Sequence, residues 1–405
     1  MAVSLGAVVA ADVRGDSVKA PLQTIPARDV NDCSSSWDLV VIGGGPAGAA
    51  AAITAARHGL RTLIADRSEH PRPKVCGCCL SPLAIERLNA LGVSAIAAHG
   101  EQLHTVHVDC LGMLTKWQRS GVALSRARLD SELLHMAAAA GASVMTGVVA
   151  EAQPSGIVTL RKGGMAQQLN ARLVIAADGI GGSSLRSSER LRWRTLPRSR
   201  IGFGALLAHE AIDIQAGELL MCVRAGGYIG AVAIGGGIVD VAAAAEPAVV
   251  RAAGGPAALT IQWLGRRIRD RERVIHSAWT GTPRLTRRRA AATDGRIIAS
   301  GDALGYVEPF TGEGIGWALA SGIAAANHAD LVLSGRTSVY AWERTARRMS
   351  AWSHARCASM ALLVRAPRIL AAVLRVGQHA PMCAAYMGRA WGVQRTNALL
   401  GSAAR

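Results

Sequence analysis

The sequence predicts an α/β fold, and three observations carry this prediction. The chain has 405 residues, half of them apolar, so it can bury a substantial core and is longer than most single domains. It holds 45 glycines but only 2 phenylalanines, a composition that suits tightly packed α/β layers better than an all-β sandwich. Residues 37–66 read as a strand, a glycine-rich turn, a helix and a second strand, which is the repeating unit of a parallel sheet.

The strongest motif lies within this unit. A short apolar strand is followed by Gly43, Gly45 and Gly48 in the spacing G-x-G-x-x-G, and the second strand ends at Asp66. In such a unit the first glycine permits a tight turn, the second lets backbone approach a pyrophosphate, and the third lets the helix pack closely on the strand. Free N–H groups at the helix start bind phosphates, and the acid accepts hydrogen bonds from ribose hydroxyls. The complete unit predicts a dinucleotide site and leaves NAD and FAD both open.

Composition argues against several other classes of protein. The formal charge is +17, but nearly all the cations are arginines and no aromatic run is interleaved with them, so we expect no nucleic-acid partner. The cluster of Cys76, Cys78 and Cys79 is not followed by a second ligand pair at zinc-site spacing, so we expect no metal. No apolar run reaches the roughly 20 residues of a membrane-spanning helix.

Three downstream stretches decide between the two cofactors. They are residues 125–144, 172–186 and 295–322. With the first motif, and in the same order, they resemble the superfamily of FAD-dependent oxidoreductases that includes aromatic hydroxylases, geranylgeranyl reductases and flavin-dependent halogenases. The resemblance runs from about Trp37 to about Gly335. It implies a Rossmann-like FAD-binding domain of the glutathione-reductase and hydroxylase type, a β-sheet substrate domain and a helical C-terminal tail.

The resemblance also implies roles for individual residues. Arg126 resembles the arginine that reaches the flavin cofactor. Asp178 lies in an Asp-Gly motif associated with FAD and, in the hydroxylases, with NAD(P)H, and Asp302 follows Gly301 in a Gly-Asp motif whose acid bonds the ribityl chain. The expected cofactor-binding set is Gly43, Gly45, Ala47, Gly48, Asp66, Arg67, Lys74, Arg126, Asp178, Gly301, Asp302, Pro309, Gly312 and Gly314. We expect non-covalent FAD, with NADPH or NADH as a transient electron donor because only one complete nucleotide motif is present.

The loop at residues 309–314 resembles the one that runs beside the isoalloxazine ring. A helix is predicted after it, at residues 315–333. Because a helix N-terminus carries partial positive charge, this helix would stabilise the anionic reduced ring.

Two residues are candidates for catalysis. The segment from Lys74 to Gly77 resembles the reductase and halogenase branch, in which this loop approaches the flavin, so Cys76 is one candidate and a small buried thiol is the alternative. Tyr228 lies where the reductases carry Tyr-x-Trp-x-Phe-Pro, and it is a candidate substrate contact in a predicted hairpin at residues 226–246. The Trp, Phe and Pro are missing, which argues against prenyl reduction, and the halogenase Trp-x-Trp is absent from the chain.

These observations favour an NAD(P)H-using FAD monooxygenase that hydroxylates an aromatic, polyketide or isoprenoid-like small molecule. The alternatives are a geranylgeranyl-reductase-like enzyme that reduces C=C bonds of a lipid, and a non-catalytic FAD-binding protein or sensor. The expected FAD-binding domain comprises residues 37–95, 125–190 and 290–335, and the substrate domain residues 96–124 and 191–289.

The two ends of the chain receive simpler interpretations. Residues 1–36 show no clear periodicity and are expected to be a flexible extension, or to result from a start codon assigned too far upstream. Residues 336–405 hold eleven arginines and one acid, and Arg365, Arg368 and Arg375 fall on one face at about 100° per residue. The favoured interpretation is a helical cap with a solvated basic face, although Pro367 interrupts any long helix. The alternative is a membrane-surface helix or a lid over an oily substrate. We therefore expect a cytoplasmic enzyme, and the alternative adds peripheral contact with a membrane through this region.

Overall fold

The computed structural model describes residues 37–76, 78–308, 310, 312–377 and 393–394. The expected extension at residues 1–36 and the predicted cofactor neighbour Pro309 lie outside the described residues.

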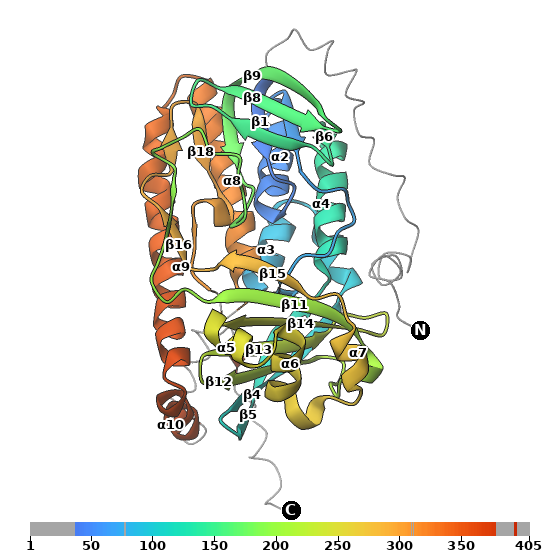
Figure 1. Cartoon of the computed structure of the whole chain (residues 1–405). Helices are drawn as coiled ribbons and strands as arrows, with labels where there is room; N and C mark the ends of the chain where they lie inside the picture. The colour runs from blue at the N-terminus through green and yellow to red at the C-terminus, as the bar shows by residue number, and fades with distance from the viewer. Residues whose placement is uncertain (1–36, 77, 309, 311, 378–392, 395–405) are drawn as a thin grey trace, which may run out of the picture.

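An eight-stranded sheet forms the upper layer in Figure 1. Its central strands run β17-β18-β9-β1-β2-β6, and β1 pairs in parallel with both β9 and β2. The strands are β1 (Trp37–Ile42), β2 (Thr62–Ala65), β6 (Ser143–Met145), β7 (Val149–Ala152), β8 (Ile157–Lys162), β9 (Met165–Ala176), β17 (Thr293–Asp294) and β18 (Ile297–Ala299). Because parallel strands end at the same edge of a sheet, the turns after β1, β2 and β9 meet at one place.

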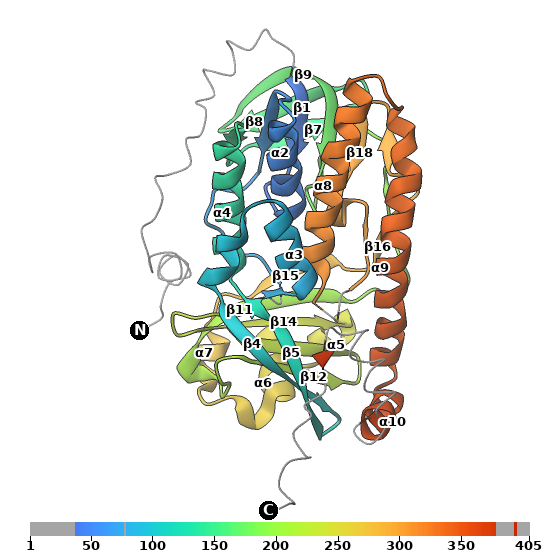
Figure 2. The same cartoon turned by 180° about the vertical axis from the view of Figure 1, so that it is seen from behind.

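Helices cover one face of this sheet. They are α2 (Pro46–Arg57), α4 (Arg126–Ala139) and α8 (Gly314–Leu333), with α3 (Pro82–Ala90) reaching toward the second sheet (Figure 2). The small residues of α2 let α8 approach closely, since a Cβ on Gly322 would lie 2.0 Å from the carbonyl oxygen of Ala47. The predicted helix at residues 315–333 is therefore confirmed, and its first turn lies against the start of α3, where a Cβ on Gly316 would lie 3.0 Å from the backbone nitrogen of Ala84.

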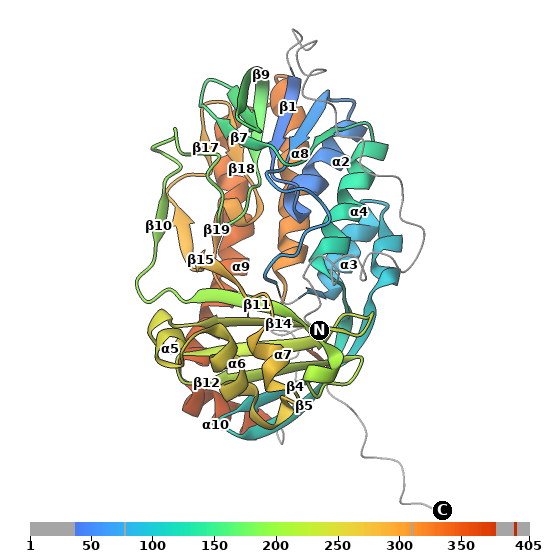
Figure 3. The same ribbon diagram turned by 45° about the vertical axis from the view of Figure 1, so that its right-hand side comes forward.

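A nine-stranded sheet forms the lower layer in Figure 1, ordered β15-β11-β14-β13-β12-β4-β5-β20, with β3 paired to β5. Its strands are β3 (Cys79–Leu80), β4 (Glu101–Cys110), β5 (Met113–Ala123), β11 (Ile201–Ala208), β12 (Glu218–Arg224), β13 (Gly227–Ala233), β14 (Ile238–Ala245), β15 (Thr280–Arg284) and β20 (Val393–Gln394). The predicted hairpin is confirmed as β13 and β14, with Ala231 opposite Val241. Three short helices, α5 (Pro247–Ala252), α6 (Pro256–Leu264) and α7 (Arg271–Ile275), lie on its outer side (Figure 3).

A third sheet of three short strands stands beside the two layers: β10 (Trp193–Thr195), β16 (Arg287–Arg289) and β19 (Gly305–Tyr306). Short 3₁₀ helices complete the described chain: η1 (Ser94–His99), η2 (His209–Ala211), η3 (Gly265–Arg267), η4 (Gly301–Ala303) and η5 (Val339–Ala341).

The long helix α9 (Trp342–Arg365) runs along both layers and is followed by α10 (Pro367–Gly377), with a bend of 103° between them (Figure 2). Arg365 ends α9, whereas Arg368 and Arg375 lie on α10. The prediction that these three arginines share one helical face is therefore wrong. Proline lacks an N–H and clashes with the preceding turn, so Pro367 starts a new helix instead of continuing the old one.

Among the described helices, none alone is long and apolar enough to cross a membrane, and the bent pair at residues 339–365 and 367–376 passes that test only when taken together.

Candidate cofactor and substrate site

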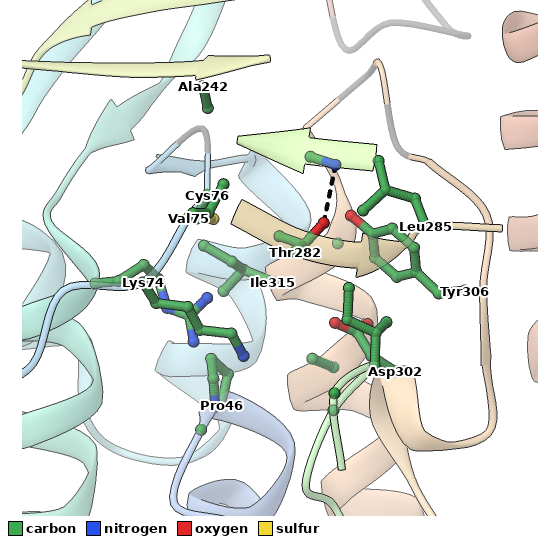
Figure 4. A pocket seen from close by; sticks show the side chains of 18 of the residues that line it. Pro46, Lys74, Val75, Cys76, Ala242, Thr282, Leu285, Asp302, Tyr306 and Ile315 are labelled. Atoms are coloured by element: carbon green, nitrogen blue, oxygen red, sulfur yellow. Dashed lines mark hydrogen bonds between the residues drawn. The ribbon is translucent and has the colours of Figure 1, made fainter. Parts of the chain in front are cut away.

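One continuous cavity of about 480 Å³ lies between the two large sheets. It extends from the glycine turn before α2 to the apolar face of the lower sheet, and Figure 4 shows Lys74 and Cys76 facing Asp302 and Tyr306 across it. The predicted site residues that line it are Gly43, Gly45, Ala47, Asp66, Arg67, Lys74, Cys76, Arg126, Asp178, Tyr228, Asp302, Gly312 and Gly314. Gly48 and Gly301 do not line it.

Each glycine of the turn has a different structural reason to be glycine. Gly43 adopts φ +109°, and a Cβ there would lie 2.5 Å from the carbonyl oxygen of Ala177 on the neighbouring strand end. A Cβ on Gly48 would lie 1.8 Å from the carbonyl oxygen of Gly43, so Gly48 permits the packing of the turn without reaching the cavity. At Gly45 a Cβ would meet nothing closer than Arg126 Nη2 at 3.7 Å. The space beside Gly45, at the N-terminus of α2, is therefore open to a ligand.

Asp66 ties the end of β2 to this turn. Its carboxylate accepts hydrogen bonds from the backbone N–H of Gly44 and, at 2.7 Å, from that of Ser68. Burial alone would raise the pKa of this carboxyl, but hydrogen bonding to His70, the charge of Arg72 and the two backbone N–H groups outweigh it and hold the pKa well below its usual range. Asp66 is thus ionised and already positioned before any ribose binds.

Gly301 does not line the cavity, but it positions the residue that follows it. It adopts φ +59°, and a Cβ there would lie 2.6 Å from Cβ of Ala47. Its N–H donates to Ser321 Oγ at 2.9 Å. The glycine lets η4 pack between α2 and α8, and this packing presents the next residue, Asp302, to the cavity.

Two cations lie near the Asp302 carboxylate. Arg126 forms two hydrogen bonds to Asp130, of 2.9 and 2.8 Å, and is almost fully buried. Lys74 has no hydrogen-bond partner among the described residues, and burial together with the charge of Arg126 lowers its pKa. Burial raises the pKa of Asp302, while the charges of Lys74 and Arg126 oppose this rise. Within this cavity the Lys74 ammonium can bind an anionic group, and the Asp302 carboxylate can accept hydrogen bonds from a chain of hydroxyl groups.

Asp178 organises the loop after β9. Its Oδ2 accepts from the backbone N–H of Ser184 at 3.0 Å, and its buried Oδ1 has no partner among the described atoms. A Cβ on Gly182 would lie 2.0 Å from this carboxylate, so the loop folds tightly around it. Asp178 therefore offers one free acceptor at the cavity edge.

The N-terminus of α8 also opens on the cavity. Gly314 is its first residue, and the preceding Glu313 makes no capping hydrogen bond with its side chain. Glu313 is instead 3.4 Å from Arg356 of α9. The first N–H groups of α8 consequently lie at the cavity with the positive end of the helix dipole, which suits an electron-rich ring edge.

The cavity-facing side of the lower sheet is mostly apolar and has a centre of small residues. Gly204, Ala242 and Gly230 are neighbours across β11, β14 and β13. Met221 of β12 pairs with Gly230, and its Sδ would lie 2.9 Å from a Cβ added to Gly230. Tyr228 closes one end, in edge-to-face contact with Phe310 at 5.0 Å between ring centroids.

Asp240, which the sequence analysis missed, lies on this same face. It is 5% exposed and stands between Leu206 and Val232 on the adjacent strands. Burial raises the pKa of its carboxyl to about 8, although a hydrogen bond with Cys78 and the charge of Arg126 oppose the rise. The available signal was a single acid inside an otherwise apolar strand of the predicted hairpin.

A second buried group, also missed, pairs Arg200 with Glu308 at 3.0 Å, both nearly inaccessible to solvent. Arg200 also lies 5.8 Å from the centre of the Tyr228 ring. This ion pair fixes the wall behind Tyr228.

The residues present fit an FAD molecule. The open space at Gly45 suits a pyrophosphate at a helix N-terminus, and Asp66 suits a ribose. The Asp302 carboxylate, which lines the cavity, suits hydroxyl groups further along it. Comparison with known proteins agrees with this fit: the model of the FAD binding domain family matches residues 36–215. Residues 36–215 of this chain therefore match an FAD-binding domain, and the predicted resemblance to the superfamily of FAD-dependent oxidoreductases is confirmed.

Curated relatives are named as reductases. A menaquinone reductase of Mycolicibacterium smegmatis is 35% identical over 120 residues, which is 27% of this chain and 29% of that protein. A digeranylgeranylglycerophospholipid reductase of Methanothrix thermoacetophila is 27% identical over 327 residues, 75% of this chain and 80% of that protein. The match to the mycobacterial enzymes therefore spans less than a third of their length.

Solved structures share the fold. A flavin-dependent brominase superposes with a TM-score of 0.75 at 15% identity, covering 88% of this chain and 94% of the brominase. A geranylgeranyl bacteriochlorophyll reductase-like protein of Thermoplasma acidophilum superposes with a TM-score of 0.68 at 20% identity, covering 84% and 91%. The predicted fold class, an FAD-binding α/β fold with a second β-sheet and a helical C-terminal region, is confirmed.

Proposed function

We propose that this chain is an FAD-dependent reductase that saturates a C=C bond in an apolar, isoprenoid-like molecule. The observation that carries the proposal is the single cavity, which joins the FAD-binding residues to a sheet face lined by Gly230, Ala242, Met221 and Val232. An apolar chain placed against this face would lie between the sheet and the flavin. The two curated relatives described above are named as a menaquinone reductase and a digeranylgeranylglycerophospholipid reductase, which supports a reductase activity.

The missing aromatic residues after Tyr228 argued against this activity in the sequence, and the structure weakens that argument. Gly230 stands at the position of the missing Trp. Met221 Sδ would lie only 2.9 Å from a Cβ on Gly230, so a side chain from the neighbouring strand already occupies part of that space. The apolar surface is thus supplied by β12 instead of β13.

Hydroxylation, which the sequence favoured, is the second candidate. The observation in its favour is the aromatic wall of Tyr228 and Phe310, whose rings could contact a planar substrate. A Pseudomonas aeruginosa protein, PqsL, solved with 2-aminobenzoylacetate, shares the fold with a TM-score of 0.63 at 19% identity, covering 84% of this chain and 99% of PqsL.

For either activity we propose NADPH or NADH as the transient electron donor and a cytoplasmic location. Only one complete nucleotide motif is present, at residues 37–66, and it belongs to FAD in this proposal. We also propose that the upper sheet with its helices binds FAD and that the lower sheet binds substrate, as the domain boundaries predicted from the sequence suggest.

Steady-state oxidation of NADPH and NADH tests the proposal. The FAD-loaded protein is incubated with a menaquinone or a digeranylgeranyl glycerophospholipid, with and without oxygen. A reductase consumes the nicotinamide donor without oxygen and in proportion to the alkene reduced. Donor consumption that requires both oxygen and an aromatic substrate supports hydroxylation. FAD binding with no stimulated oxidation in either condition supports a non-catalytic FAD-binding protein.

A further inference from the structure

We propose that Asp240 is the acid that protonates the substrate double bond during its reduction. This role rests on the reductase function proposed above, and it assigns the proton donor to a residue of the substrate sheet.

The position of Asp240 in the sheet supports the assignment. Side chains alternate between the two faces of a strand, so Asp240 shares the cavity face of β14 with Ala242 and Ala244. On this face of β11, β12, β13 and β14, Asp240 is the only carboxylate. It lines both the main cavity and a small adjoining one of about 30 Å³.

Its hydrogen bonding leaves one oxygen free. Oδ2 is buried and has no partner among the described atoms, although the side chain is only 5% exposed. A buried polar atom without a partner destabilises the folded chain, so a structural role alone does not explain it. A substrate group that accepts the proton would give this oxygen its missing partner.

The surroundings of Asp240 keep the acid protonated. The ionisable groups around it are Cys78, from the loop before β3, Cys79, at the start of β3, and Arg126, at the start of α4. Its strand neighbours Leu206 and Val232 are apolar. Arg126 is occupied by its two hydrogen bonds to Asp130 and does not form an ion pair with Asp240. With a pKa of about 8, the carboxyl carries its proton at neutral pH.

The reaction balances with this acid. One carbon of the substrate double bond accepts hydride from reduced flavin, and the other carbon takes the proton from Asp240 with the electron pair of the π bond. The products are the saturated chain, oxidised flavin and the Asp240 carboxylate. NAD(P)H supplies the next pair of electrons, and water returns the proton to the carboxylate.

Cys76 is the rival donor. Its thiol lines the cavity from the loop before β3 and is only partly buried. Cys76 and Asp240 stand on different elements, so single variants separate their contributions.

The test compares Asp240→Asn, Cys76→Ser and the control Asp213→Asn, which removes a half-buried carboxylate that pairs with Arg267 and Arg269 outside the cavity. Each FAD-loaded protein is reduced with dithionite and mixed without oxygen with a menaquinone or a digeranylgeranyl glycerophospholipid, and saturation of the C=C bond is followed by mass spectrometry after any quinol has been reoxidised in air. We expect saturation of the alkene to slow by about 100-fold or more in Asp240→Asn and to change little in Cys76→Ser and the control. Reduction of each oxidised protein by NADPH should stay within about three-fold of the parent, because no proton passes through Asp240 in that half-reaction.

A second measurement uses the protein without substrate. Asp240 has a raised pKa in the folded chain, so the stability it contributes is fully present below its unfolded pKa near 3.8 and is lost as pH rises through about 8. Chemical denaturation from pH 5 to 9 should show this loss in the parent and the control but not in Asp240→Asn, which confirms a properly folded variant with the acid removed.

The outcomes separate the two proposals. If the parent reduces neither probe, the reductase function is wrong and the role of Asp240 falls with it. If the parent reduces a probe and Asp240→Asn does so at an unchanged rate, Asp240 is not the donor and the reductase function stands. A large loss in Cys76→Ser with an unchanged Asp240→Asn assigns the proton to the thiol.

Discussion

The carboxylate of Asp66, at the end of β2, accepts a hydrogen bond from the backbone N–H of Gly44, in the turn that follows β1. Sequence reasoning gave the acid one role, the binding of a ribose. In the structure it also holds the glycine turn against the neighbouring strand, so the shape of the pyrophosphate site depends on it.

Asp66 should make stability sensitive to acid. Because its pKa is depressed in the folded chain, its stabilising contribution is fully present above its unfolded pKa of 3.8 and declines as pH falls below that value. Asp66→Asn should lower the free energy of unfolding at pH 7 and flatten its acid dependence, as measured by urea denaturation between pH 3 and 7. An unchanged acid dependence in Asp66→Asn would show that the carboxylate is not ionised against its partners.

Gly45 should be replaceable without unfolding but not without losing FAD. A Cβ at this position meets no atom closer than 3.7 Å, and its φ of −78° is normal for any residue, so larger side chains fit the protein itself. Gly45→Val should place its methyl groups where the pyrophosphate lies and abolish FAD binding at an unchanged melting temperature, with Gly45→Ala intermediate. Full FAD retention by a folded Gly45→Val protein would mean that the pyrophosphate lies elsewhere.

Asp302 and Asp178 should differ in phenotype. A hydrogen bond to a charged group contributes about 1.5–3 kcal/mol, so Asp302→Ala should weaken FAD binding about ten- to a hundred-fold, measured by titration of the apoprotein. Asp302→Asn keeps an acceptor and should lose less. Asp178→Ala should retain FAD and mainly slow its reduction by NADPH in stopped flow. Exchanged phenotypes would show that the two roles are reversed.

Peripheral membrane contact stays a prediction, and α10 is where to test it. Ile369 and Val376 are 60% and 56% exposed beside the exposed Arg368 and Arg375. We expect the protein to sediment with anionic vesicles and less so at high salt. Ile369→Glu should abolish binding, whereas the control Ile275→Glu, at a similarly exposed site on α7, should not. Equal binding of both variants would exclude α10 as the contact.

The sequence was sufficient to predict those parts of the fold whose structure depends on one short segment. The unit from β1 to β2 has its apolar strands, its turn and its helix within residues 37–66, so each part follows from its neighbours. The hairpin of β13 and β14 follows in the same way from two apolar runs around three glycines.

The missed residues depend on contacts between distant segments. Asp240 is buried because β11 and β13 flank it, and its environment comes from Cys78 and Arg126, over a hundred residues earlier in the chain. Arg200 and Glu308 are 108 positions apart, so neither predicts the other. The pairing of strands decides which charges are buried, and no local pattern in the sequence records it.

The most direct test of the reductase account is a single anaerobic turnover followed by mass spectrometry of the product. Protein with its FAD reduced by dithionite is mixed with a digeranylgeranyl glycerophospholipid in the absence of oxygen, in an equimolar amount. The account predicts a lipid that has gained two hydrogen atoms, in amounts equal to the flavin oxidised. An unchanged lipid beside reduced flavin, together with a product that gains an oxygen atom only when air is admitted, would contradict it.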